Sequence, residues 1–369
     1  MQFQLGSDHS RLTFPARLRF GHWHSCLTSA LARSQSDKNR ILLVTSPSQL
    51  DRVAGADLPE SCKVLVMRSC DTETIARLDS ECAMHRADVL VAFGGGRVID
   101  LCKSVAAVRA TTLVAIPSTL SSDCVASPVC VVSGVDGVRS LPGAIPSEII
   151  IDAEVLAAAP SRYLHAGVGD LLSNDSAVAD IREGVAGEVN DFAILLAETS
   201  VQKVAHIETL SMSRDALTSE LAKGLILSGM AMGFAGNSAP CSGSEHLISH
   251  ALDSIRPGRA LHGEQVGLAT LFVGSLRDLA GLTPLNPMVK TVLHQVCRYT
   301  SPETFGISRA DFISAIQLAS QVRPGRRPFW SRFPQRESVF EEAYANAFTQ
   351  TIGSRKHSAH REHEFTSAV

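Results

Sequence analysis

Short runs of apolar residues without a polar interruption recur through the first 155 residues, and no other feature constrains the fold as strongly. They lie at residues 41–44, 64–67, 89–93, 113–116 and 149–151. Stretches with helical spacing, such as 72–86 and 98–109, separate them. Such runs are typical of parallel strands that helices cover on both faces. We therefore predict that the chain begins with an α/β domain built on a parallel sheet.

Beyond residue 158 this strand pattern ends. Helical spacing instead fits the stretches 191–207, 215–234, 245–255, 264–279, 287–299 and 309–322. A series of helices after a βα region predicts a second, all-α domain. We place the boundary near 157–161, which gives one domain over residues 1–158 and another over residues 159–369.

The composition agrees with two domains and excludes several classes of protein. The chain has 369 residues, 45% of them hydrophobic and 19% charged, with a formal net charge of −3. Lysine and arginine cluster only near the C-terminus, which argues against nucleic acid as a partner. The nine cysteines form no CxxC pair, so they predict neither a disulfide framework nor a zinc ribbon.

The N-terminus and the apolar runs bear on the cellular location of the protein. The N-terminus lacks the basic and apolar regions of a signal peptide, and no apolar run approaches the ~18 residues of a membrane span. We expect a cytoplasmic protein without a membrane span. The basic segment 323–336 and the histidine-containing tail from residue 353 are interpreted as solvated surface.

A turn of three glycines follows the third apolar run. Gly94, Gly95 and Gly96 stand between a predicted strand and a predicted helix. Glycines here allow close approach to a phosphate, and the helix N-terminus adds partial positive charge. The GxGxxG fingerprint is absent, so a tight turn without a ligand is the alternative. Asp100 and Lys103, one turn apart on the helix, fit an exposed pair that contributes only tenths of a kcal/mol.

A polar loop follows the next predicted strand. It carries Ser118, Thr119, Ser121, Ser122, Asp123 and Ser127. This loop could line a cofactor or a polyol, or it could be a plain turn, since serine and threonine favour turns. Ligands of open parallel sheets bind at the carboxyl ends of the strands. We favour the ligand interpretation because this loop and the glycine turn leave the same sheet edge.

One aspartate and three histidines form a candidate metal site. Asp170 follows two glycines, where it could simply cap a helix that begins there. His246 and His250 share one helical face, and His262 follows soon after. A carboxylate and two imidazoles suit a divalent metal with an open fourth position. The spacing does not choose among the three histidines, and helical histidines are usually structural.

Several longer motifs add a resemblance. The segments "GGGRVIDLCK", "IPSTLSSDCVASP", "GVGDLLSN", "SGMAMGFAGNSAPCSGSEHLISHALD" and "PGRALHGEQVGLAT" resemble those of the sn-glycerol-1-phosphate dehydrogenase family. Its superfamily also contains glycerol dehydrogenase, dehydroquinate synthase and iron-containing alcohol dehydrogenases. The resemblance implies a dehydroquinate-synthase-like fold, with a Rossmann-like nucleotide-binding domain and an all-α domain for metal and substrate.

The resemblance also implies residue roles. It places Zn²⁺ on Asp170, His246 and His262, and it assigns substrate contacts and catalysis to Asp123, Asp170 and His250. It implies that NADH or NADPH is bound by these residues: Gly94, Gly95, Gly96, Asp100, Ser118, Thr119, Ser121 and Ser127. Asn174 replaces a histidine that iron-dependent relatives use as a fourth ligand, which favours zinc over iron.

The implied reaction is reduction of dihydroxyacetone phosphate to sn-glycerol 1-phosphate, in an expected homo-oligomer. Another phospho- or phosphonate ketone, a dehydroquinate-synthase-like cyclisation and a non-catalytic binding protein are the alternatives. Two departures from the family pattern concern specificity. Asp123 lies between Ser122 and Cys124 where the family usually has His-Asp-Gly, and no acidic residue follows the first strand to hold a ribose. For the substrate phosphate, Lys103 and Arg259 are candidate contacts.

Overall fold

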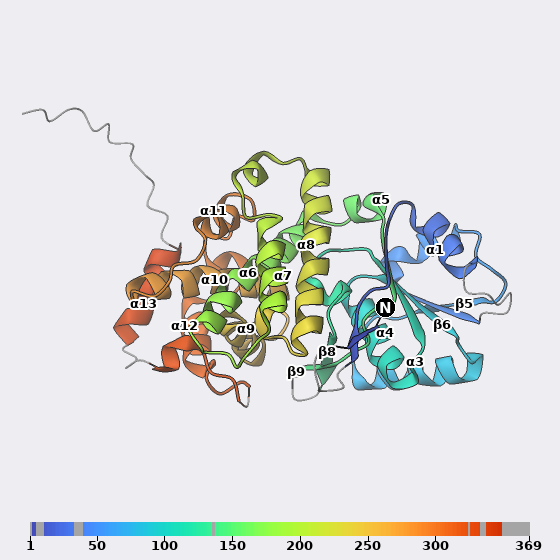
Figure 1. The fold of residues 1–369 in the computed structure, drawn as a ribbon, viewed down its shortest axis with the longest axis horizontal. Coiled ribbons are helices and arrows are strands. Elements are labelled where there is room, and N and C mark those ends of the chain that lie inside the picture. Colours follow the sequence, from blue (N-terminus) through green and yellow to red (C-terminus); the bar gives the residue numbers. More distant parts are fainter. Residues whose placement is uncertain are drawn as a thin grey trace, which may run out of the picture.

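A six-stranded parallel sheet forms one half of the molecule (Figure 1). The structure, a computed structural model, describes residues 2–4, 11–32, 40–134, 137–323, 325–332 and 337–348. The sheet has the order β3-β10-β7-β6-β4-β5, and every neighbouring pair is parallel. Its strands are β3 (Arg17–Phe20), β4 (Ile41–Thr45), β5 (Cys62–Val66), β6 (Val89–Gly94), β7 (Thr112–Pro117) and β10 (Glu148–Ile151).

Helices and two small antiparallel pairs complete this half. The helices are α1 (Trp23–Ala32), α2 (Leu50–Ala54), α3 (Thr72–His85), α4 (Gly96–Arg109) and α5 (Ala153–Ala157). The pairs are β1 (Gln2–Gln4) with β2 (Arg11–Thr13), and β8 (Val129–Gly134) with β9 (Gly137–Pro142). The five predicted strands are confirmed to within two residues at each end.

Both faces of the inner strands of the sheet are buried, as uninterrupted apolar strands predict. In β4, Leu42 and Val44 belong to one apolar cluster, whereas Ile41 and Leu43 belong to a second cluster with Trp23. Side chains alternate between the two faces of a strand, so each face has its own core. The sheet is thus a middle layer between helices.

Helices make up the other half (Figure 1). They are α6 (Ser161–Arg182), α7 (Asp191–Gln202), α8 (Arg214–Ala235), α9 (Ser244–Ile255), α10 (His262–Leu279), α11 (Pro287–Gln295), α12 (Arg309–Leu318) and α13 (Glu337–Phe348). Beyond residue 158 the described residues contain no strand. None of the described helices combines the length and the apolar character that a bilayer span requires.

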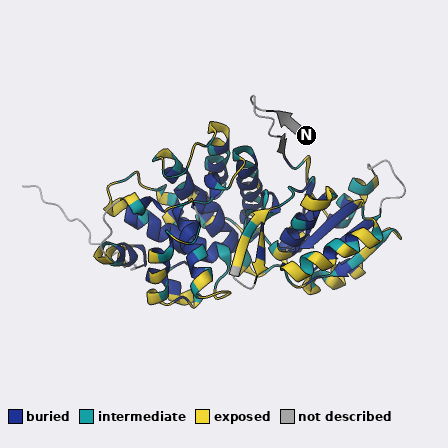
Figure 2. Cartoon of the chain, turned by 90° about the horizontal axis from the view of Figure 1, so that it is seen from below, coloured by how far each residue is buried: buried dark blue, intermediate teal, exposed yellow. Residues whose placement is uncertain are grey.

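One apolar cluster extends from the sheet into the helical half. It contains residues of β4 and β6 as well as residues of α10 and α13, and Figure 2 shows buried segments throughout both halves. Because this core is shared, it does not itself mark a boundary. The division at residue 158 stays a prediction.

The helix around Asp170 differs from the prediction. Asp170 does not begin a helix: α6 begins at Ser161, and Asp170 is buried near its middle. The preceding glycines permit close packing instead of a turn. A Cβ atom on Gly167 would lie 2.0 Å from the carbonyl oxygen of Leu120, and one on Gly169 would lie 2.3 Å from that of Gly263. These contacts press α6 against the loop after β7 and against α10.

Candidate active site

Three side chains from three helices converge where α6, α9 and α10 meet. Oδ1 of Asp170 lies 3.8 Å from Nε2 of His246 and 3.6 Å from Nε2 of His262. One donor atom from each residue falls within a 4.8 Å span. Zinc bonds of ~2.0–2.2 Å in tetrahedral geometry separate ligand atoms by roughly 3.3–3.5 Å. The donor set therefore fits a divalent zinc ion after a small contraction.

His250 lies outside this set. His250 lies on α9, one turn after His246, and its ring centroid is 6.3 Å from that of His262. The geometry thus separates the three histidines, which sequence spacing alone does not.

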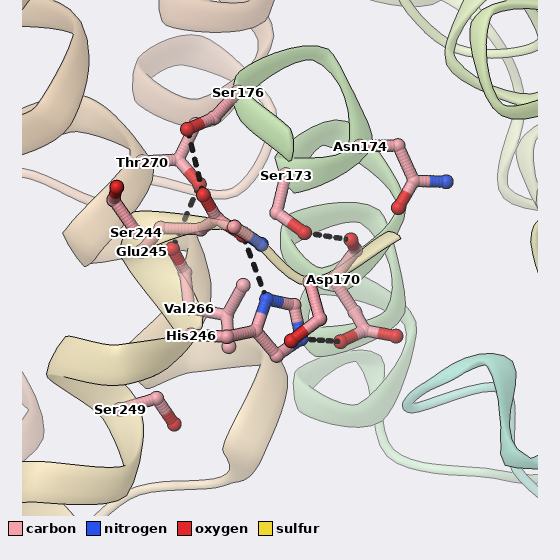
Figure 3. Close-up of polar contacts among 12 residues, drawn as sticks. Asp170, Ser173, Asn174, Ser176, Ser244, Glu245, His246, Ser249, Val266 and Thr270 are labelled. Carbon is pink, nitrogen blue, oxygen red and sulfur yellow. Dashed lines mark hydrogen bonds and ion pairs between the residues drawn. The ribbon is translucent and has the colours of Figure 1, made fainter. Parts of the chain in front are cut away.

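A buried glutamate orients His246 (Figure 3). Glu245 accepts a hydrogen bond of 2.8 Å from Nδ1 of His246, and it also accepts from Ser176 Oγ at 2.6 Å and from the backbone N–H of Gly243 at 2.7 Å. With its proton on Nδ1, the imidazole presents the lone pair of Nε2 to Asp170. The adjacent "EH" letters were the available signal for this pair, yet the sequence interpretation gave Glu245 no role.

A longer relay orients His262. Ser249 donates its hydroxyl proton to Oε1 of Gln265 at 2.7 Å, so at 3.2 Å it accepts from Nδ1 of His262. Gln265 donates in turn to Asp253 at 2.9 Å. This relay leaves Nε2 of His262 facing Asp170. Sequence reasoning missed Ser249 and Asp253, because their partners lie 12 to 16 residues away.

Asp123 meets Asp170 through the backbone. It begins a single 3-10 turn (Asp123–Val125), and its N–H donates to Oδ2 of Asp170 at 3.0 Å. Its own carboxylate accepts from Ser228 Oγ at 2.9 Å. Burial raises the pKa of both carboxyls to about 7, and the charge of Asp170 adds to the shift of Asp123. A cation at the donor set would offset the repulsion between these two carboxylates.

Asn174 faces a different network. Its amide donates to Ser200 Oγ at 2.9 Å and to Ser228 Oγ at 3.0 Å, one helical turn beyond Asp170. In Figure 3 its side chain stands apart from the His246–Asp170 pair. Asn174 thus supports Asp123 through Ser228 and does not join the donor set.

The glycine turn forms a backbone cradle. β6 ends at Gly94 and α4 begins at Gly96, with Gly95 in an extended conformation at the cap. A Cβ on Gly94 would lie 2.7 Å from Val98 Cγ2, and one on Gly95 would lie 3.0 Å from Thr119 Oγ1. Bare backbone at a helix N-terminus suits a phosphate, so the cradle fits a dinucleotide.

The hydroxyl-rich loop borders that cradle. The backbone N–H of Ser118 donates to the carbonyl oxygen of Gly94 at 2.9 Å, so the two loops leave one sheet edge together, as predicted. Ser118 and Ser127 are buried, whereas Thr119 and Ser121 are half-buried. Roles of these side chains toward a cofactor stay predictions.

The interpretation of Asp100 and Lys103 as an exposed pair is wrong. Lys103 is fully buried, and its ammonium donates to Cys124 O at 2.8 Å, to Ser127 Oγ at 3.1 Å and to Val129 O, with Asp100 Oδ1 at 3.4 Å. Asp100 accepts from the N–H of Val131 at 3.1 Å. The pair fixes the loop and the β8–β9 hairpin, which leaves Lys103 no donor for a substrate phosphate.

The interpretation of segment 323–336 as wholly solvated is also wrong. Residues 328–330 are buried, and Phe329 N–H donates to Ser244 Oγ at 2.9 Å. Arg326 donates to Ser242 O at 3.0 Å and to Ser238 Oγ at 3.2 Å. Residues 324, 333–336 and the tail 349–369 lie outside the described residues.

Related sequences indicate the enzyme family that this chain resembles. The family described as iron-containing alcohol dehydrogenase matches residues 26–160. A glycerol-1-phosphate dehydrogenase (NAD(P)+) of Hyperthermus butylicus is 32% identical over 268 residues, which cover 70% of this chain and 74% of that protein. The enzyme of the same name from Pyrococcus furiosus is 30% identical over 325 residues, covering 85% and 92%.

Solved structures agree on the fold. A probable glycerol dehydrogenase from Sinorhizobium meliloti superposes with a TM-score of 0.72 at 22% identity, covering 93% of this chain and 99% of that one. Glycerol dehydrogenase from Schizosaccharomyces pombe gives 0.69 at 20% identity, covering 92% and 90%. The dehydroquinate-synthase-like fold is thereby confirmed.

Proposed function

The chain belongs to the glycerol-1-phosphate dehydrogenase family, and from this premise we propose that it reduces dihydroxyacetone phosphate to sn-glycerol 1-phosphate with NADH or NADPH and Zn²⁺. The observation that carries the proposal is the donor set of Asp170, His246 and His262 beside Asp123. Three protein ligands leave one coordination position for a substrate oxygen.

The residues of the chain would have the following roles in this reaction. Asp170, His246 and His262 would hold zinc, which when bound acts as a Lewis acid toward a ketone oxygen. A reduced nicotinamide supplies hydride, and Gly94 to Gly96 would hold its pyrophosphate. The proton that the new hydroxyl needs would come from bound water, from Asp123 or from His250. Asp123 suits this role because its carboxyl lies beside the donor set, its N–H bonds Asp170, and burial raises its pKa.

We propose that either NADH or NADPH can serve as the hydride donor. β4 ends at Thr45, and Ser46 and Pro47 follow, so no carboxylate stands there to repel a 2′-phosphate. The experiment is a parallel assay with NADH and NADPH against dihydroxyacetone phosphate, other small keto phosphates and keto phosphonates. Oxidation of NAD(P)H by dihydroxyacetone phosphate with formation of sn-glycerol 1-phosphate supports the proposal. Turnover of a different ketone alone, or phosphate elimination without net cofactor oxidation, contradicts it.

A homo-oligomeric state and a cytoplasmic location stay predictions. Light scattering on the purified protein measures the first, and fractionation of source cells measures the second.

A further inference from the structure

Helices α9 and α12 run antiparallel, which brings the segment after α12 back along the metal-binding helix. Arg256 at the end of α9 pairs with Asp311 in the first turn of α12 at 3.0 Å. Beyond α12, Arg326 and Phe329 bind Ser242 and Ser244 at the start of α9. The chain between these anchors therefore runs beside α9, the helix that carries His246 and His250.

Arg323 lies on this stretch. Its backbone carbonyl accepts from the N–H of Arg326 at 3.3 Å, so it sits one turn before the anchor on Ser242. Its charge contributes to the lowered pKa of His250, after the larger effect of burial. Because Arg326 and Phe329 anchor this stretch on Ser242 and Ser244, Arg323 lies beside the first turn of α9, which carries His246.

The charge of Arg323 has no partner among the described parts of the chain. The side chain is half-buried, and it makes no hydrogen bond or ion pair with any of the residues that the structure describes. Burial and the charge of Arg326 both lower its pKa. A partly buried, unpaired cation beside another cation is costly in free energy, and an anionic ligand would offset that cost.

Three other cations around the site already bind protein groups. Lys103 holds the loop after β7, Arg326 holds the start of α9, and Arg162 forms a two-bond pair with Glu264 at 2.6 and 2.7 Å. Arg259, a candidate from the sequence, is exposed. We propose that Arg323 binds the phosphate group of the substrate, an inference that rests on the proposed function. A planar guanidinium matches phosphate with two parallel hydrogen bonds.

The test compares R323Q and R323K with the wild type and with R327Q, which removes the same charge from an exposed side chain four residues along. In R323Q the KM for dihydroxyacetone phosphate should rise roughly 10- to 100-fold. The ratio of kcat/KM for dihydroxyacetone phosphate to kcat/KM for dihydroxyacetone should fall by a similar factor. R323K should recover part of this loss, and R327Q should behave as wild type.

A binding measurement separates this inference from the proposed function. Inorganic phosphate is titrated calorimetrically into each zinc-loaded protein, and R323Q should bind it at least about tenfold more weakly than wild type. If wild type reduces dihydroxyacetone phosphate and R323Q keeps both its KM and its phosphate affinity, the assignment of Arg323 is wrong. If wild type reduces no keto phosphate, the proposed function is wrong, and the phosphate titration alone judges Arg323. Should R323Q fail to fold, R323K carries the comparison.

Discussion

Glu245 and His246, neighbours in the chain, are joined by a hydrogen bond of 2.8 Å between a carboxylate oxygen and Nδ1. Glu245 is fully buried, and Ser176 and the N–H of Gly243 hold its oxygens in place. A carboxylate in this position fixes the tautomer of a metal-binding imidazole and increases its basicity. The pair therefore bears directly on metal affinity.

Replacing Glu245 with glutamine should weaken Zn²⁺ binding about 10- to 100-fold, because the amide is a poorer acceptor for the Nδ1 proton. Competition with a chromogenic chelator measures the affinity without any assay of catalysis. Glu188→Gln is the matched control, since Glu188 is exposed. An E245Q protein with wild-type zinc affinity would show that Glu245 is only a core residue.

His262, which belongs to the donor set, and His250, which lies outside it, should respond differently to removal. His262→Ala deletes one of the three donors, so zinc content after dialysis should fall to background and hydride transfer should stop. His250→Asn should keep stoichiometric zinc and lose turnover, because His250 lies outside the set. Full metal retention in H262A would refute the ligand assignment.

Asp123→Asn should keep zinc and lower kcat/KM for the ketone by roughly 100-fold or more, if the carboxyl moves the proton of the reaction. Ser228→Ala, which removes the hydroxyl that donates to Asp123, should give a smaller loss. Unchanged kinetics in D123N, with zinc content and folding as in wild type, count against its role.

Lys103→Met should destabilise the protein by about 3–5 kcal/mol, because Asp100 then becomes an unpaired buried carboxylate. Urea unfolding measures the free energy. The double variant with Asp100→Asn removes that charge and should recover part of the loss. Equal stability of K103M and wild type would show that the buried cation does not hold the loop.

The sheet was predictable because its signal is local. Every residue of β4 is buried, and its first four letters are apolar without a gap. The β8–β9 hairpin was not predicted, although its own ladder is local; its bond to Asp100 joins residues about 30 positions apart. The start of α6 was misplaced because Gly167 and Gly169 look like a turn when their steric partners on other elements are unknown.

The candidate site was only partly predictable for the same reason, because most of its contacts join residues far apart in the sequence. Spacing marked His246 and His250 as sharing a face, but only the fold brings His262 and Asp170 to one of them and not the other. Family resemblance supplied that choice in advance; Asp170, His246 and His262 lie together in the structure, and their role as metal ligands stays a prediction. Nothing in the local sequence marked Arg323, because its position beside α9 depends on the antiparallel course of α9 and α12.

Gly263→Ala tests whether the close contact between α6 and α10 builds the metal site. A Cβ atom there would lie 1.9 Å from the carbonyl oxygen of Ala166, so the two helices would have to move apart. We expect a stability loss of about 1–3 kcal/mol. Zinc affinity should fall in parallel, since Asp170 and His262 stand on the two separated helices. Gly187→Ala is the control, because a Cβ at Gly187 meets nothing within 4 Å. Thermal unfolding and chelator competition on both variants measure the two effects. A destabilised G263A protein with wild-type zinc affinity would show that the donor set does not depend on this helix contact.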